Sequence, residues 1–219
     1  MLVELIPVLE ITRYSTGVPM PESSGPYNPE VWDEYHAACF VAAGLPDKLV
    51  PYTTGSWFYR FNDISDANLK KLIWDQTEVT REEDYEWEDY GRSFYGGYVL
   101  RIDGEDKYFP QCCTDLSDIT SWEELVTDQP GTFYTGHPSP TVTVHDGMIT
   151  FDFATPVPNE PFAHGVPDEK LSFNVELLRQ ALANTKIELD EFAGRLIRIN
   201  ESEKLGIPRI DQFLIWNRY

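Results

Sequence analysis

TVTVHDGMITFDF, residues 141–153, is the stretch that decides the fold class. Apolar and polar residues alternate at period two on both sides of the Asp146-Gly147 pair, which is the pattern of two strands with one buried face. An Asp-Gly pair between such runs favours a tight hairpin, because both central residues of that turn need positive φ. We therefore predict an antiparallel hairpin here.

A second hairpin is predicted upstream. Residues 93–102 (SFYGGYVLRI) and 107–109 flank another Asp-Gly pair, Asp103-Gly104. The glycine pair at 96–97 lies inside the strand pattern, where glycine is typical of a bulge or a close backbone contact. Residues 210–216 (IDQFLIW) form a last apolar run, which we also predict as a strand.

Helical periodicity is found on both sides of the hairpins. Residues 28–44 and 65–76 each carry apolar residues on one face, and Asn28 with Pro29 is a typical start of a helix. A short helix capped by Thr120 or Ser121 is predicted between the hairpins. Residues 174–200 predict one bent helix or two helices.

This mixture of elements defines the fold class. Hairpins that pair locally, with helices between and after them, predict an α+β fold with a mainly antiparallel sheet built from hairpins. We expect helices packed on one side of that sheet and a C-terminal helical segment. A length of 219 residues fits a single α+β domain over residues 1–219. The alternative is a subdivision near residues 156–170 that sets off a C-terminal helical part, residues 170–219.

Composition excludes several classes of partner. The chain has 17 basic and 37 acidic residues, a net charge of −20, with 42% apolar and 14% aromatic residues. Such a chain can form an ordered core, so we expect a soluble globule. Nucleic acids and anionic membranes are not expected partners, because binding them depends on basic residues.

The first residues and the cysteines indicate the compartment. Residues 1–11 contain Glu4 and Glu10 and lack a basic start, so they predict a strand rather than a signal peptide. The three cysteines, two of them adjacent, show no disulfide framework and fit a reducing compartment. We predict a cytoplasmic protein with free thiols.

The negative charge is concentrated in the first three quarters of the chain. Residues 1–169 hold 9 basic and 30 acidic residues, whereas residues 170–219 hold 8 and 7. The densest run, residues 78–89 (EVTREEDYEWED), has seven carboxylates and one arginine. It is either an exposed solvating loop or a docking face for a cationic partner, since aromatic rings among carboxylates suit Lys and Arg. The second interpretation gives a face that we name the acidic segment (residues 82–90): Glu82, Glu83, Asp84, Tyr85, Glu86, Trp87, Glu88, Asp89 and Tyr90.

A second set of residues carries reactive groups. Cys112, Cys113 and His137, which we name the thiol site, could support a cysteine nucleophile with a histidine base. His145 is an alternative base, and Asp115 could orient either histidine. Carboxylates around Cys113 oppose thiolate formation. The alternative is that these residues belong to a structural turn.

Metal binding is the other chemistry that these residue types allow. His36 and Cys39 lie three apart on one helix face, and the thiol site adds ligand types. Adjacent cysteines are expected to diverge, and paired Cys-x-x-Cys knuckles are missing from the sequence. We therefore predict no metal and no cofactor, with Cys39 in the core and the adjacent pair at a sheet edge. Phosphate-loop, nucleophile-elbow and zinc-helix motifs are also missing.

In acidity, aromatic content and α+β class, the chain resembles bacterial immunity or inhibitor proteins that neutralise basic toxins. The resemblance implies a non-enzymatic binding protein that engages a basic protein partner through the acidic segment. The alternative is a hydrolase or metal-dependent enzyme that uses the thiol site. A self-associating subunit is a third possibility, because the Trp-rich strands and residues 213–216 could form a homodimer surface. The sequence does not give the oligomeric state.

Overall fold

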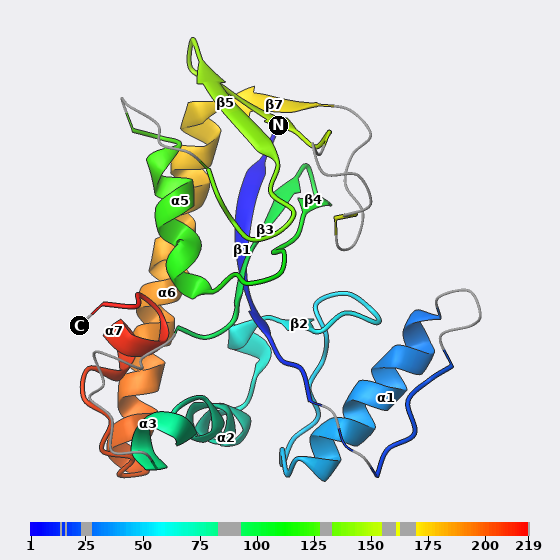
Figure 1. Cartoon of the computed structure of the whole chain (residues 1–219). Coiled ribbons are helices and arrows are strands. Elements are labelled where there is room, and N and C mark those ends of the chain that lie inside the picture. Colours follow the sequence, from blue (N-terminus) through cyan, green and yellow to red (C-terminus); the bar gives the residue numbers. More distant parts are fainter. Residues whose placement is uncertain are drawn as a thin grey trace. The chain divides into compact units, whose positions relative to one another are not determined.

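The structure is a computed structural model, shown in Figure 1. It describes residues 1–13, 15, 17–22, 28–82, 93–127, 133–154, 161–162 and 170–218. Strands and helices are intermixed along the chain, and the strand pairs with a defined register are all antiparallel. The predicted α+β class is therefore confirmed, with two sheets where one was expected.

The chain forms two compact units. Unit 1 comprises Met1–Pro7 with Tyr95–Glu191, and unit 2 comprises Val8–Phe94 with Phe192–Tyr219. The chain passes between them inside strand β1 (Val3–Glu10), after Phe94 and inside helix α6 (Val175–Ser202). These boundaries lie away from residues 156–170, and the single-domain prediction stays a prediction.

The first hairpin of unit 1 joins β3 (Gly96–Ile102) to β4 (Glu105–Tyr108). Its turn residues Asp103 and Gly104 have φ of 50° and 83°, as the Asp-Gly signal predicts. Gly97 has φ of 141°, and a Cβ there would lie 3.2 Å from the Pro110 Cβ. The close contact predicted for the glycine pair is thus present, and β1 is the other neighbour of β3.

The second sheet of unit 1 contains the deciding stretch. β5 (Thr141–His145), β6 (Met148–Asp152) and β7 (Leu171–Asn174) pair in that order. Asp146 and Gly147 form the turn with φ of 49° and 74°. Phe151 and Phe173 are fully buried and stack at 5.8 Å between ring centroids, so alternation buries one face of this sheet.

The helical layer of unit 1 begins earlier than predicted. A 3₁₀ turn, η2 (Leu116–Asp118), leads directly into α5 (Ile119–Glu124). Asp115 caps this turn, and the Asp118 carboxylate accepts from the Asp115 N–H in return. The prediction of Thr120 or Ser121 as the cap is wrong because this capping box starts the helical segment upstream. α5 lies beside α6 in Figure 1, joined by an ion pair between Lys186 and Glu123.

Unit 2 contains α1 (Pro29–Ala42), β2 (Phe58–Tyr59), η1 (Phe61–Asp63), α2 (Asp66–Gln76), α3 (Glu78–Glu82) and α7 (Ile210–Leu214). Asn28 caps α1, as the sequence predicts, and Ser65 caps α2. β2 pairs with the end of β1. Phe61 stacks on Phe192 with 4.3 Å between ring centroids. The Arg195 guanidinium also donates to the carbonyl of Phe61 and the carboxylate of Asp66.

Two predictions about the C-terminal part are resolved. The stretch predicted as one or two helices is a single helix from residue 175 onward, α6, while Asn174 ends strand β7. Residues 210–216 are not a strand, because α7 covers Ile210–Leu214. Ile210, Phe213 and Leu214 are the buried residues of α7, and their spacing of three and four suits one helical face.

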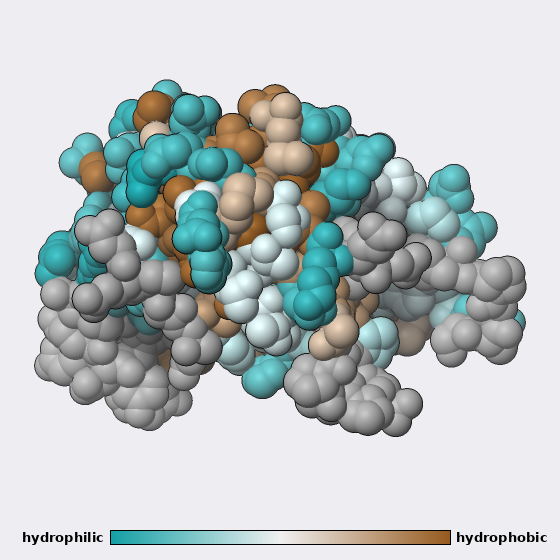
Figure 2. Space-filling view, turned by 90° about the horizontal axis from the view of Figure 1, so that it is seen from above, coloured by the Kyte–Doolittle hydropathy of each residue, from teal (hydrophilic) through white to brown (hydrophobic). Residues whose placement is uncertain are grey.

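The surface mixes apolar and polar residues. Figure 2 shows hydrophobic residues among hydrophilic ones on the face seen there. The large apolar side chains exposed among the described residues include Met1, Leu2 and Met148. None of the described helices has both the length and the apolar character needed to cross a membrane.

Candidate functional site

Two loops of unit 1 meet at the residues singled out for thiol chemistry. Cys112 and His137 form an antiparallel bridge: the Cys112 N–H donates to the His137 carbonyl at 3.2 Å, and the His137 N–H donates back at 3.1 Å. Directly opposed residues of such a pair place their side chains on one face. The structure therefore brings Cys112 and His137 together although 24 residues separate them in the sequence.

The two cysteines converge rather than diverge. Neither cysteine is in a disulfide, both are exposed, and the two Sγ atoms lie 3.1 Å apart. Cys113 has φ of 71°, the left-handed conformation that non-glycine residues rarely adopt. The expectation of diverging side chains holds for an extended backbone, and the left-handed residue overturns it here.

Buried groups fix the position of these loops. Gly136 has φ of 84°, and a Cβ there would lie 2.4 Å from the Cys112 carbonyl oxygen and 2.7 Å from Thr114 Cγ2. The Thr114 hydroxyl donates to the Gln111 carbonyl at 2.8 Å. The Tyr108 hydroxyl is hydrogen bonded to the Thr135 carbonyl and hydroxyl. The exposed thiols thus lie on a closely packed, hydrogen-bonded layer of residues.

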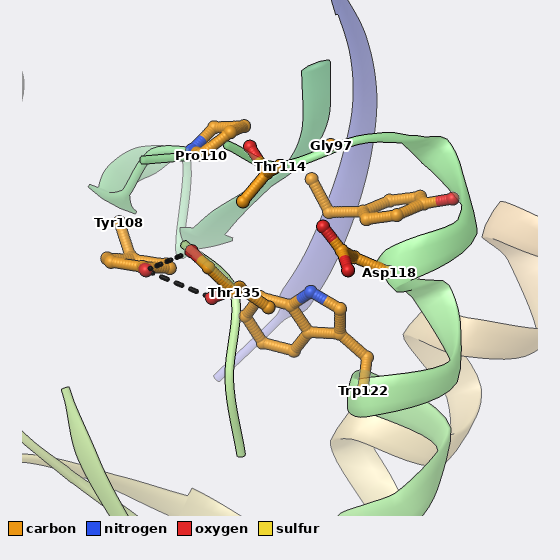
Figure 3. Close-up of a pocket in the computed structure, with 8 residues that line it drawn as sticks. Gly97, Tyr108, Pro110, Thr114, Asp118, Trp122 and Thr135 are labelled. Atoms are coloured by element: carbon orange, nitrogen blue, oxygen red, sulfur yellow. Dashed lines mark hydrogen bonds between the residues drawn. The ribbon is translucent and has the colours of Figure 1, made fainter. Parts of the chain in front are cut away.

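A small pocket lies within this layer of residues (Figure 3). It is lined by Gly97, Tyr98, Tyr108, Pro110, Thr114, Asp118, Trp122 and Thr135. Figure 3 shows Asp118 and Trp122 projecting into it from one helical segment, with Tyr108 and Thr135 on another side. The pocket has room for about one water molecule. The pocket is too small for an organic substrate.

Asp118 is the titratable group of this pocket. Burial raises its pKa to about 6, while the hydrogen bond from the Asp115 N–H lowers the pKa and the Asp115 charge raises it. Burial also raises the pKa of Tyr98 well above its usual value, and the Tyr98 hydroxyl donates to the Leu116 carbonyl at 2.5 Å. The raised pKa of Asp118 could not be predicted from the sequence, because only the fold shows that its carboxyl group is partly buried.

The histidine is positioned beside an aromatic ring. Tyr134 packs edge-on against His137 with ring centroids 5.4 Å apart, and both side chains are exposed. Desolvation raises the pKa of Tyr134, with smaller increases from Cys113 and Asp118.

The expected orienting role of Asp115 is not seen. Its carboxylate accepts from the Ser117 N–H at 2.7 Å and from the Ser117 hydroxyl at 2.5 Å. His145, the alternative base, lies at the β5–β6 turn with Nδ1 2.9 Å from Asp146. Within the described ranges, no hydrogen bond joins Asp115 to His137.

Metal binding finds little support among the described residues. No group of three His, Cys, Asp or Glu side chains in the part of the chain that the structure describes is arranged to hold an ion. Cys39 is buried in α1, which confirms it as a core residue. Desolvation lowers the pKa of His36, and its Nδ1 is buried without a hydrogen-bond partner among the described atoms.

The acidic segment lies almost wholly outside the described residues. Glu82 is the last residue of α3, and Glu83 to Tyr90 fall outside the described part of the chain. Arg81, the one basic residue of the run, is held against α2. Its guanidinium lies 3.4 Å from the centroid of the Trp74 ring, and it donates to the Trp74 carbonyl and the Thr77 hydroxyl.

Comparison of the chain with family models, curated proteins and solved structures found no match.

Proposed function

We propose that this chain is a non-enzymatic acidic binding protein that engages a basic protein partner through the acidic segment. The observation that carries the proposal is the density of charge, with seven carboxylates and one arginine in residues 78–89. Carboxylates in such a run steer a cationic partner during association and pair with its arginines. Tyr85, Trp87 and Tyr90 supply the aromatic contact area typical of binding hot spots.

The residues that lead into the acidic segment support this proposal. Trp74 and Val79 are 46% and 58% exposed, and they lie on α2 and α3 directly before it. Arg81 already has Trp74 and Thr77 as partners. Exposed aromatic and apolar groups next to a carboxylate run give a partner both a contact surface and an attractive field.

The proposal extends to the biological setting. A cytoplasmic immunity or inhibitor protein that neutralises a basic toxin would need such a surface, and a net charge of −20 opposes nucleic-acid and anionic membrane partners.

Affinity capture with charge variants tests the proposal. The acidic-segment variant carries Glu83→Gln, Glu86→Gln and Glu88→Gln. Its control carries Glu124→Gln, Asp190→Asn and Glu191→Gln, three exposed carboxylates of unit 1. Both variants lose three negative charges. An effect of net charge alone would therefore weaken binding equally in the two.

We expect the wild type to capture one dominant basic protein at low salt, released by high salt. The acidic-segment variant should bind it about tenfold more weakly, taking ~0.5 kcal/mol for each lost ion pair with the partner, while the control stays near wild type. Tyr85→Ala with Trp87→Ala should also lose binding without loss of thermal stability. If the acidic-segment variant and its control lost the same affinity for the partner, a defined binding face would be contradicted.

The bridge between Cys112 and His137 favours a second candidate, a hydrolase that uses a cysteine nucleophile. The two residues pair through their backbones, and a cysteine nucleophile needs a general base near its thiol. In this case His137→Asn should slow alkylation of Cys112 by iodoacetamide near neutral pH, whereas His145→Asn should not. Equal alkylation rates in the wild type and both variants would contradict a hydrolase that uses this thiol.

A further inference from the structure

The thiol pair has properties that neither candidate function uses. Cys112 and Cys113 are reduced, exposed and adjacent, with their Sγ atoms 3.1 Å apart. Thiols that are accessible and next to a second thiol are the ones that oxidise reversibly, because the neighbour captures the first oxidation product. Their proximity depends on the left-handed Cys113, whose φ is 71°.

The platform beneath the thiols holds this arrangement. Both backbone hydrogen bonds of the bridge join Cys112 to His137, and Gly136 packs so closely that a Cβ would lie 2.4 Å from the Cys112 carbonyl oxygen. Gln111 and Thr114, which flank the cysteines, are buried. The backbone on both sides is therefore fixed while the thiols themselves face solvent.

We propose that Cys112 and Cys113 are a redox modification site, which a peroxide oxidises reversibly to a disulfide between adjacent residues. One thiolate attacks a peroxide oxygen, the O–O bond breaks, and a sulfenic acid and one water form. The neighbouring thiol then attacks the sulfenic sulfur, the S–S bond forms, and the S–O bond breaks to release a second water. Two electrons and two protons pass from the thiol pair to the peroxide.

The geometry makes this modification reversible. Bonded sulfurs lie about 2 Å apart, so the thiols need to approach by about 1 Å. Adjacent Cα atoms are ~3.8 Å apart across a trans peptide, below the usual spacing of ~4.4 to 6.8 Å for bridged cysteines. A bond closed at this spacing is strained and easily reduced, so a thiol reductant returns the site to its starting form.

Oxidation of the folded protein, followed by mass spectrometry of its peptides, tests the proposal. Cys39 is an internal reference because it is buried. Brief treatment with hydrogen peroxide should remove two hydrogen atoms from the peptide that contains both cysteines. Dithiothreitol should restore the original mass. Cys39→Ser should behave like the wild type, while Cys112→Ser and Cys113→Ser should not lose the two hydrogens and should gain oxygen instead.

Three results would overturn the proposal. Wild-type protein could gain oxygen at either cysteine instead of losing hydrogen, or form disulfide-linked dimers. Alternatively, wild type could keep its mass under conditions in which Cys112→Ser gains oxygen. Thermal melting of each variant before oxidation separates these outcomes from loss of folding.

Discussion

The thiol site of unit 1 and the α2–α3 region of unit 2 hold their polar groups in different ways. At the thiol site, Cys112 is fixed by backbone hydrogen bonds to His137, which is distant in sequence, and by close packing on Gly136. In the α2–α3 region, Arg81 is fixed by Trp74 and Thr77, seven and four residues earlier. The first arrangement suits reactive groups that need fixed geometry, and the second suits charge that acts over distance.

The largest effect is expected at Gly136. Gly136→Ala combines positive φ with a severe overlap on the Cys112 carbonyl, so we expect it to cost about 3 kcal/mol of unfolding free energy. Gly147→Ala has a similar φ but nothing within 4 Å of the added Cβ, so about 1 kcal/mol is expected. Urea unfolding of both variants measures the difference. Equal losses would show that the close packing at the bridge adds no stability.

A smaller effect is expected at Asp115, which caps the helical segment below the thiols. Asp115→Ala removes the bonds to the Ser117 N–H and hydroxyl and should cost about 1 kcal/mol. Ser65→Ala, which removes the cap of α2 in unit 2, is the matched variant. Thermal unfolding compares them, and no loss in Asp115→Ala would contradict its role as the cap.

Asp118 gives a pH-dependent prediction. Its folded pKa of about 6 is above its ordinary value of 3.8, so the folded state binds the proton more tightly and stability falls as pH rises from about 4 to 6. Asp118→Asn should remove this fall and stabilise the protein by about 1 kcal/mol at neutral pH, after allowance for solvent screening.

Urea unfolding of Asp118→Asn at pH ~3.5 and ~7 provides the measurement. The variant and the wild type should differ little at the lower pH. An equal difference at both pH values would mean that the carboxylate charge is not what destabilises the folded state.

The smallest effect is expected at Arg81. Arg81→Met should cost about 0.5 to 1 kcal/mol, since the guanidinium loses its position over the partly exposed Trp74 ring. Lys48→Met removes the same charge from another exposed position of unit 2 and should cost less. Equal losses in thermal unfolding would assign the effect to charge alone.

The sequence predicted the elements whose signals are local. The two Asp-Gly hairpins and the Asn28 cap depend on residues close together in the chain, and all three are confirmed. It mistook residues 210–216 for a strand because a short apolar run fits either period.

The site could be predicted only in part. Cys112, Cys113 and His137 were singled out by residue type, but their meeting depends on a bridge between distant loops. The convergence of the thiols depends on one left-handed residue, Cys113, which no local signal reveals. The role of Tyr134 and the burial of Asp118 likewise arise from tertiary packing.

The most direct test of the proposed function is the association rate of the captured basic partner with wild-type protein and with the Glu83, Glu86 and Glu88 variant. The rates would be compared at ~0.01 M and ~0.15 M salt, where charges are screened beyond ~30 Å and ~8 Å. We predict that wild type associates much faster at low salt and that the variant loses most of this gain, while the Glu124, Asp190 and Glu191 control keeps it. A wild-type rate that does not change with salt would contradict the acidic segment as a binding face.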